Sequence, residues 1–147
     1  MSRKLVWRAE GRLFVAVHAA QDPSRIEWSD YVRTAVELST REDPRVYVVS
    51  YGGGPNGAQR AELTTALAGR PSPTVLLTAS RLVKTSIVVL NWFNPKMTAV
   101  GLREHHLACR ALGLSPQESD RVAAIRRELE EELGISEGSA AQATSAL

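Results

Sequence analysis

The sequence predicts an α/β domain in which a mainly parallel sheet of four to five strands has helices packed against it, followed by an extra C-terminal helix. Short β-branched runs alternate along the chain with segments of helical periodicity, and glycine or proline punctuates most boundaries. Parallel strands must be joined by crossovers, so this alternation favours a parallel sheet. The 147 residues, 44% of them hydrophobic and 23% charged, have the composition of a globular domain that can bury a core.

The chain begins with a predicted pair of strands and a helix. Residues 5–7 and 13–19 are expected to be strands joined around Glu10-Gly11, because side chains in the second run alternate with the period of a sheet. The segment Ser24–Glu27 has the spacing of a capping box, in which a serine and a glutamate satisfy free amides at a helix start. A helix is therefore expected from this point to about Ser39.

A strand, a glycine-rich loop and a second helix follow. Residues 45–51 (RVYVVSY) are typical of a buried strand, and the loop Gly52–Gly57 ends it. Asn56 and Gln59 have the spacing of another N-terminal cap, so a helix is expected to begin there. Residues 74–78 (TVLLT) predict a short buried strand after the next proline-rich turn.

The third helix is the least certain element of the sequence pattern. Ser80 has the position of a cap for a helix running to Phe93, where Asn94-Pro95 stops it, but residues 87–90 also read as a strand. We favour the helix because no glycine or proline supplies the turn that a strand would need. A short strand over residues 97–100 and a helix over residues 102–112 complete this part of the chain.

The last predicted helix has the strongest local pattern. Ser115–Glu118 combines a capping box with proline at the first helical position, and Gly134 ends the helix. Its apolar seam recurs at helical spacing, at Val122, Ile125, Leu129 and Leu133. We expect an α/β domain over residues 1–114, an amphipathic helix over 115–135 that packs on that domain or on a partner, and a disordered tail over 136–147.

Composition narrows the classes of protein. One cysteine, Cys109, precludes an internal disulfide and fits a reducing compartment. The longest uncharged apolar stretch, residues 85–94, has about half the length of a membrane span. Charged residues interrupt the N-terminal segment, which therefore lacks the apolar centre of a signal peptide. We accordingly expect a cytoplasmic protein without a membrane span.

The charges are distributed unevenly. The net charge is +2, yet residues 117–147 hold three arginines and seven acidic residues, so the remainder is mildly basic. We expect the acidic helix and the basic body to attract each other. No cluster of lysine and arginine alternates with aromatic residues, and we therefore do not expect nucleic acid as a partner.

The order of predicted elements resembles the STAS domain (sulfate transporter and anti-sigma-factor antagonist) over about residues 5–112. Three stretches carry the resemblance. They are strand 45–51 leading through a glycine-rich loop into the helix from Gly57, strand 74–78 followed by residues 79–83 and a helix ending near Phe93, and strand 97–100 followed by residues 102–105. The resemblance implies a STAS-like fold and a loop-and-helix surface for protein contacts.

Signalling members of this family carry an Asp-Ser-Ser-Gly loop in which a serine is phosphorylated. On this chain the four places fall at Gly54, Pro55, Asn56 and Gly57, so the glycine is present and both serines are missing. Asn56 stands at the phosphoacceptor position. The resemblance therefore implies a partner surface without the usual phosphoserine switch.

The same loop matches the dinucleotide fingerprint, with glycines at positions 52, 54 and 57 between a strand and a helix. No acidic residue lies between Glu62 and Glu104 to hold a ribose, and Pro55 removes an amide from the expected phosphate cradle. We interpret the glycines first as a tight turn and then as a protein-contact loop. A phosphate or nucleotide site is the weakest of the three interpretations.

His105, His106 and Cys109 are the residues closest to a metal or nucleophile pattern. A structural zinc site needs four ligands, and the other histidine, His18, belongs to a distant strand. No residue is recognisable as the group that would orient a histidine for thiolate chemistry. We interpret Cys109 as a core residue and expect neither a metal nor a cofactor.

The predicted helix over residues 81–93 is apolar on nearly all sides, which is typical of a helix buried on more than one side. It is expected to lie under the C-terminal helix, to form a dimer or partner interface, or to line an apolar pocket. Arg81 and Lys84 at its start are candidates for contact with an anionic partner or lipid head group.

These observations predict a non-catalytic STAS-like module that regulates or scaffolds by binding a protein partner or a second copy of itself. The candidate partner-binding residues are Gly54, Pro55, Asn56, Gly57, Gln59, Arg81 and Lys84. The alternative is a carrier of a small apolar or lipid-like ligand beneath the helix over residues 81–93. An enzyme is the third and weakest hypothesis, because we find no nucleophile elbow, paired carboxylates or metal-ligand spacing.

Overall fold

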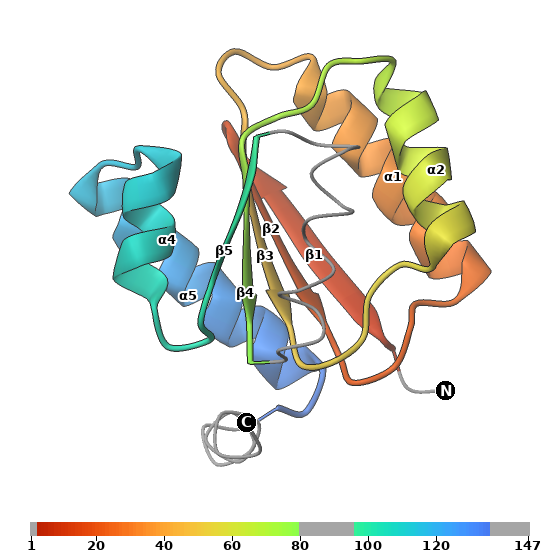
Figure 1. The fold of residues 1–147 in the computed structure, drawn as a ribbon. Coiled ribbons are helices and arrows are strands. Elements are labelled where there is room, and N and C mark those ends of the chain that lie inside the picture. Colours follow the sequence, from red (N-terminus) through yellow and green to blue (C-terminus); the bar gives the residue numbers. More distant parts are fainter. Residues whose placement is uncertain (1–2, 80–95, 136–147) are drawn as a thin grey trace.

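The computed structural model describes residues 3–79 and 96–135, and its elements follow the predicted α/β order (Figure 1). The strands are β1 (Leu5–Glu10), β2 (Leu13–His18), β3 (Arg45–Ser50), β4 (Thr74–Thr78) and β5 (Met97–Val100). The helices are α1 (Arg25–Ser39), α2 (Gly57–Leu67), α4 (His105–Leu112) and α5 (Pro116–Glu132). The expected helix over 81–93, with Arg81 and Lys84, and the expected tail over 136–147 lie outside the described residues.

The five strands form one sheet in the order β1-β2-β3-β4-β5. β1 pairs antiparallel with β2, and each later neighbour pairs in parallel. Val15 faces Tyr47 across the β2–β3 pair, and Val48 faces Leu76 across the β3–β4 pair. The mainly parallel sheet is therefore confirmed, with β1 as its one antiparallel strand.

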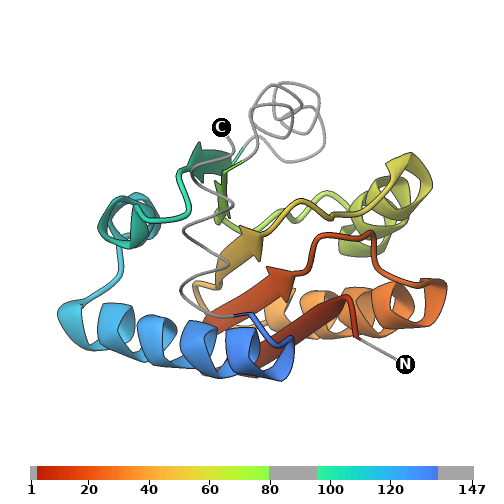
Figure 2. The same cartoon turned by 90° about the horizontal axis from the view of Figure 1, so that it is seen from below.

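The helices cover both faces of the sheet (Figures 1 and 2). α1 and α2 lie on one side, which we call the α1/α2 face, and α4 and α5 lie on the other, which we call the α4/α5 face. Because successive strand residues point to opposite faces, β2 sends Phe14 and Ala16 toward α1 while Val15 and Val17 face α5. Two separate apolar clusters result, one on each side.

Local capping fixes the starts of three helices as the sequence predicts. The side chains of Ser24, Asn56 and Ser115 each accept a hydrogen bond from the backbone amide three residues later, and the residue there reaches back in a full capping box. Pro116 occupies the first turn of α5, where its missing amide costs no hydrogen bond. These are short-range contacts, which is why spacing alone predicts them.

The α4/α5 face is sealed by the apolar seam of α5. Val122, Ile125 and Leu129 are no more than 1% exposed and join one cluster with residues of β1–β4 and α4. Burying three branched side chains of this size contributes several kcal/mol, at about 1.5–3 kcal/mol each. α5 therefore packs on the sheet of its own chain.

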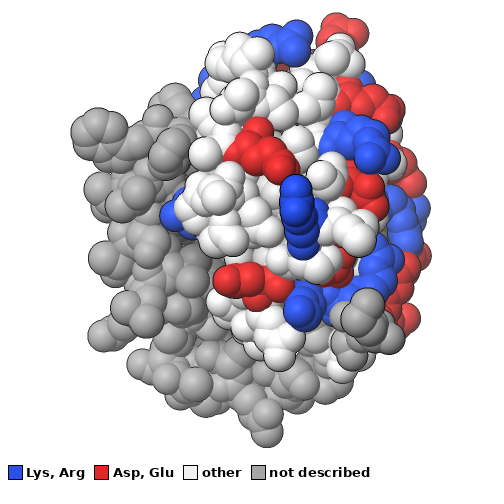
Figure 3. Space-filling model, turned by 90° about the vertical axis from the view of Figure 1, so that its right-hand side faces the viewer, with Lys and Arg blue, Asp and Glu red and all other residues white. Residues whose placement is uncertain are grey.

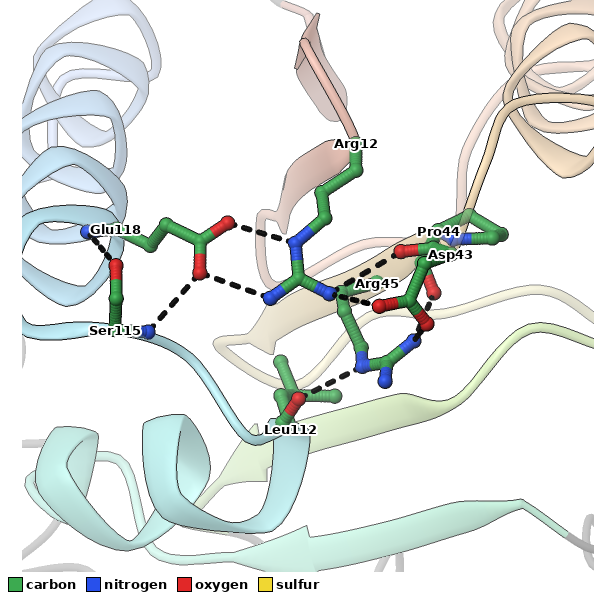
Figure 4. Close-up of polar contacts among 7 residues, drawn as sticks. All are labelled: Arg12, Asp43, Pro44, Arg45, Leu112, Ser115 and Glu118. Carbon is green, nitrogen blue, oxygen red and sulfur yellow. Dashed lines mark hydrogen bonds and ion pairs between the residues drawn. The ribbon is translucent and has the colours of Figure 1, made fainter.

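Ion pairs hold the start of α5 against the β1–β2 turn (Figure 4). Arg12 donates from Nε and Nη2 to the two carboxylate oxygens of Glu118 at 2.7 and 2.8 Å, and from Nη1 to Asp43 at 2.9 Å. Arg45 pairs with the same aspartate at 2.7 Å and donates to the Leu112 carbonyl at 2.7 Å. The basic body and the acidic helix thus attract each other through named pairs.

Two predicted boundaries are wrong by three residues, and β2 and β3 each end one residue earlier than expected, at His18 and Ser50. β1 runs to Glu10, beyond the expected end at Trp7, because its pairing with β2 continues to the register Glu10↔Leu13. α4 begins at His105 and not at Leu102, because the Glu104 carboxylate accepts from the Gly101 amide at 2.7 Å and closes a turn there. Of the helices in the described part of the chain, none is long and apolar enough to cross a membrane.

Candidate functional site

A cavity of about 430 Å³ lies on the α1/α2 face, between the sheet and the two helices. Its floor includes Phe14, Val48 and Leu76 from three adjacent strands, and Leu63 and Leu67 of α2 form part of its wall. This volume is within the range of small-molecule sites, roughly 300–1,000 Å³. The arrangement can hold a ligand the size of a short lipid or a small metabolite.

The cavity exists because α2 stands away from the sheet. No residue of α2 is fully buried, and the helix packs mainly on α1. Its sequence explains this: small and polar residues interrupt the apolar positions, so α2 has no wide stripe to press onto the strands. Leu63 packs half-buried against the apolar cluster of this face, and both Leu63 and Leu67 also line the cavity.

Polar side chains also line this largely apolar cavity. Among the described residues, the buried side-chain nitrogens without a hydrogen-bond partner are Nδ1 of His18 and Nε of Arg60, and both residues line the cavity. An unpaired buried polar group costs about 1–3 kcal/mol. Buried polar groups without a partner are uncommon in native structures, so these two nitrogens mark the cavity as a candidate site.

His18 ends β2 and is 3% exposed. Burial lowers the pKa of His18 to about 4, so its ring is neutral near pH 7. The rings of Trp28 and Tyr31 lie 6.5 and 6.4 Å from it, centroid to centroid. The ring is thus held among aromatic groups and offers a neutral nitrogen that either donates or accepts, depending on its tautomer.

Arg60 lies one turn into α2. Its Nη1 donates to the Pro55 carbonyl at 2.8 Å, which fixes the side chain along the loop. Asp22 also lines the cavity, and its carboxylate accepts from the Gly54 amide at 3.4 Å. The lining of the cavity therefore includes a cation, an anion and a neutral imidazole among apolar side chains.

The glycine-rich loop borders the same cavity, where Gly52, Gly53, Gly54 and Pro55 line it. The Gly53 amide donates to the Ala19 carbonyl at 2.8 Å, and its carbonyl accepts from the Ser50 hydroxyl at 2.6 Å. A Cβ at Gly53 would overlap the Gln21 backbone and lie 2.5 Å from the Ala19 oxygen. Position 53 therefore needs glycine, because the loop passes close to the backbone of Ala19 and Gln21 there.

These contacts weigh against a phosphate cradle in the loop. The amides of Gly52, Gly53 and Gly54 already donate to Ser50, Ala19 and Asp22. A cradle needs such amides free to point at the phosphate.

Asn56 and Gln59, two of the predicted partner-binding residues, hold α2 in place. The Asn56 side chain accepts from the Gln59 amide at 2.8 Å, and the Gln59 side chain accepts from the Asn56 amide at 3.0 Å. The Gln59 carbonyl also accepts from the Trp28 indole at 2.9 Å, which ties α2 to α1. Gly54, Pro55 and Gly57 lie beside them, whereas Arg81 and Lys84 fall outside the described residues.

Sequence reasoning did not select His18, Asp22 or Arg60 as site residues. The sequence places His18 on a strand distant from His105 and His106, and nothing in that strand distinguishes it from a core residue. The feature that marks it is an unpaired nitrogen, which depends on tertiary packing. The glycine loop is the one feature of the sequence that points to this region, because Arg60 lies in the first turn of the helix that follows it.

His105 and Cys109 meet on the opposite, α4/α5 face. The Cys109 sulfur lies 3.4 Å from His105 Nε2, and His105 Nδ1 is 2.8 Å from the Tyr47 hydroxyl. Burial raises the pKa of the Cys109 thiol and lowers the pKa of His105, which disfavours a thiolate–imidazolium pair. Within residues 3–79 and 96–135, no three His, Cys, Asp or Glu residues gather as metal ligands.

A polar network joins this pair to α5. Arg126 donates to the Tyr47 hydroxyl at 3.1 Å, to Glu130 at 3.0 Å and to the Leu102 carbonyl at 2.9 Å. The His105 ring in turn lies 3.1 Å from the Ser119 carbonyl. These hydrogen bonds hold α5 against α4 and the sheet, so the role of this network is structural.

The outer surface of the α1/α2 side mixes both signs of charge. Figure 3 views this side and shows lysine and arginine interspersed with aspartate and glutamate over the described surface. Pairs such as Arg41–Glu37 and Arg33–Asp30 on α1 account for part of this mixing. The visible described surface thus lacks the basic stripe that nucleic acid binding needs.

Comparison with known proteins adds no relative. No family model matches the chain, and no curated protein or solved structure matches it significantly. The cavity and the glycine-rich loop are therefore the features of this chain that bear on its function.

Proposed function

We propose that this protein acts by binding, without catalysis, and that its cavity on the α1/α2 face carries a small, mainly apolar ligand. The observation that carries the proposal is the cavity of about 430 Å³ with two unpaired buried nitrogens beside it. A well-formed apolar cavity with a few convergent polar groups is the usual form of a ligand site. The proposal keeps the carrier function of the alternative hypothesis but places the ligand in the α1/α2 cavity, because the site expected beneath the helix over residues 81–93 lies outside the described residues.

A cavity-filling variant tests this. N-phenyl-1-naphthylamine, a neutral apolar dye, should bind the wild-type chain saturably at one site, with enhanced fluorescence. Leu63→Trp puts an indole into the cavity and should weaken dye binding by about tenfold or more, a loss of at least about 1.4 kcal/mol. Ile26→Trp is the matched control, because Ile26 is 76% exposed on α1 and its replacement adds the same bulk outside the cavity. Equal binding by both variants would contradict the carrier function.

A second candidate is a STAS-like regulatory module that binds a protein partner, or a second copy of itself, through the Gly52–Gly57 loop and the start of α2. The observation that favours it is the rigidity of an accessible loop, in which three backbone amides and a full capping box are fixed. A preorganised loop loses little conformational entropy on association. The absence of both family serines points to binding without a phosphoserine switch.

Asn56 and Gln59 are unsuitable for testing this surface, because both hold α2. Ala58 is exposed in the first turn of α2, and Ala111 is exposed on α4. Native mass spectrometry of full-length protein from its own host should show a stoichiometric partner or a dimer for wild type and Ala111→Arg, but not for Ala58→Arg. Retention of the partner by Ala58→Arg would rule out this surface.

A further inference from the structure

We infer that the open edge of β1 pairs antiparallel with the same strand of a second copy of this chain, so that the two sheets join into one. No residue of β1 lines the cavity, and β1 lies outside the glycine-rich loop. The dimer therefore does not depend on the proposed carrier function.

β1 has a hydrogen-bonded neighbour on one side only, because it is the first strand of the sheet, between α1 and α5 (Figure 2). The Ala19 amide donates to the Lys4 carbonyl at 2.8 Å, which makes these two residues a hydrogen-bonded pair. Bonded and non-bonded pairs alternate along an antiparallel ladder, so the backbone groups of Trp7 and Ala9 point away from β2. Such an edge is a template for another strand.

The first half of this edge is covered and the second half is open. The Glu27 carboxylate of α1 accepts hydrogen bonds from the Lys4 and Leu5 amides at 2.8 and 3.2 Å. Among the residues that the structure describes, the Trp7 and Ala9 amides have no such partner. An added strand must therefore pair with the second half of β1.

A two-fold antiparallel pair is centred on one residue that faces its own copy. A pair centred on Arg8 would set two arginines directly opposite each other, which is unfavourable. A pair centred on Trp7 would place Ala9 opposite Leu5, whose amide already donates to Glu27. Neither register suits this edge.

A pair centred on Ala9 avoids both problems. It places Arg8 of each copy opposite Glu10 of the other, in a non-hydrogen-bonded pair, where facing side chains lie closest. Opposite charges at such positions stabilise strand pairing. The run Arg8-Ala9-Glu10 is thus complementary to itself in the antiparallel direction, which specifies a second copy as the partner.

The new pairs would extend ion pairs that each chain already makes with its own α5. Arg121 donates to both carboxylate oxygens of Glu10, at 2.6 and 2.8 Å. Arg8 pairs with Glu128. These side chains are 34–49% exposed, so each keeps room for a further partner. In the dimer they form a row of alternating sign: Arg121 and Glu10 of one chain, then Arg8 and Glu128 of the other.

Charge reversal in the full-length chain tests this dimer. A short edge gives a weak dimer, so sedimentation velocity should show a dimer fraction that rises from micromolar to millimolar protein. Arg8→Glu and Glu10→Arg each set like charges opposite each other twice, and each should raise the dissociation constant at least about tenfold. Arg103→Glu is the control, because Arg103 is exposed between β5 and α4, beyond the other edge of the sheet.

Mixing the two reversed variants separates pairing between chains from damage within one chain. In the mixture, the substituted position 8 of one variant faces the substituted position 10 of the other, and the unchanged residues also face each other. Opposite charges then meet at both places, so native mass spectrometry should show a heterodimer in excess over homodimers. Lost ion pairs with α5 cannot be repaired by mixing, and circular dichroism verifies that each variant is folded.

Hydrogen exchange followed by NMR locates the interface. The Trp7 and Ala9 amides should exchange quickly in dilute protein and more slowly in concentrated protein. The Val6 and Arg8 amides, which bond to β2, should be protected at both concentrations.

Three results would overturn the edge dimer. One is a wild-type chain that stays monomeric over the whole concentration range. Another is a dimer that resists both charge reversals or is lost in Ala58→Arg, since it would form through a different surface. The third is a mixture of folded reversed variants without a heterodimer, which would rule out the register centred on Ala9.

Discussion

The two faces of the sheet are formed by the same strands but differ in how closely the helices pack on them. On the α4/α5 face, α5 inserts three side chains that are at most 1% exposed, and Arg126 pairs with Tyr47 and Glu130. On the α1/α2 face, α2 buries no residue fully, a cavity remains, and two nitrogens are unpaired. The strands are common to both, so the difference comes from the covering helices. One face is closely packed, and the other keeps a cavity.

The largest difference between the two faces should appear when an apolar side chain of each is shortened. Ile125→Ala, in the seam of α5, should lower the free energy of unfolding by about 2–5 kcal/mol, because it leaves a void in a close-packed cluster. Leu63→Ala, beside the cavity, should cost about 1 kcal/mol or less, since this side chain is half-buried and already borders a hollow. Urea unfolding followed by circular dichroism measures both, and similar losses would show that the two faces are equally packed.

Lowering the pH should destabilise the α1/α2 face specifically, because His18 lies there. The pKa of His18 is lowered by burial from 6.5 to about 4, so the unfolded chain binds a proton more readily than the folded one between these values. Stability is therefore full above pH 6.5 and falls as the pH drops toward 4, by about 3 kcal/mol in total. The measurement is the free energy of unfolding of wild type and His18→Phe at intervals of pH across this window.

As the pH falls, the His18→Phe variant should lose less free energy of unfolding than the wild-type protein. His105 on the α4/α5 face also has a pKa lowered by burial, and it is present in both proteins. Asp22 and Glu27, whose charges act on His18, are unchanged as well. Any difference between the two pH profiles is therefore caused by the residue at position 18. Parallel profiles would show that His18 is not responsible for the loss of stability at low pH.

The smallest expected effect is at the ion pair between the β1–β2 turn and α5. Glu118→Gln keeps an oxygen for the capping box but removes the charge that faces Arg12. The hydrogen bond from Arg12 is the main cause that lowers the pKa of Glu118 to about 2. Both side chains are about a quarter exposed, so the loss should be about 1 kcal/mol or less and should shrink in 1 M salt.

The control for this pair is Glu37→Gln, which breaks the exposed pair with Arg41 on α1. It should change stability by less than about 0.5 kcal/mol. A Glu118→Gln loss that does not depend on salt would mean that capping, and not charge, links α5 to the body.

Sequence patterns predicted the elements whose causes are local. The three capping boxes depend on residues three apart, and they are present as expected. The end of β1 and the start of α4 were missed because strand pairing to Leu13 and a side-chain contact of Glu104 decide them. Neither contact is visible in periodicity.

The candidate site was predictable only in part. The glycine loop was selected from its composition, and it does border the cavity. The interrupted apolar positions of α2 indicate that it lacks a wide apolar stripe, but the cavity itself depends on tertiary packing that residue spacing does not specify. His18 and Arg60 become distinctive only when the fold leaves their nitrogens without partners.

The packing of α5 across β1 and β2 also sets the order in which the chain can fold during synthesis. Arg12 meets Glu118 across 106 positions of sequence, and Arg8 meets Glu128 across 120. Until residues 116–132 have left the ribosome, the inner side chains of the first two strands lack their cover. Contacts of such long sequence separation slow folding and prolong the exposure of apolar strands. A nascent chain of this protein therefore needs protection from aggregation until α5 has docked.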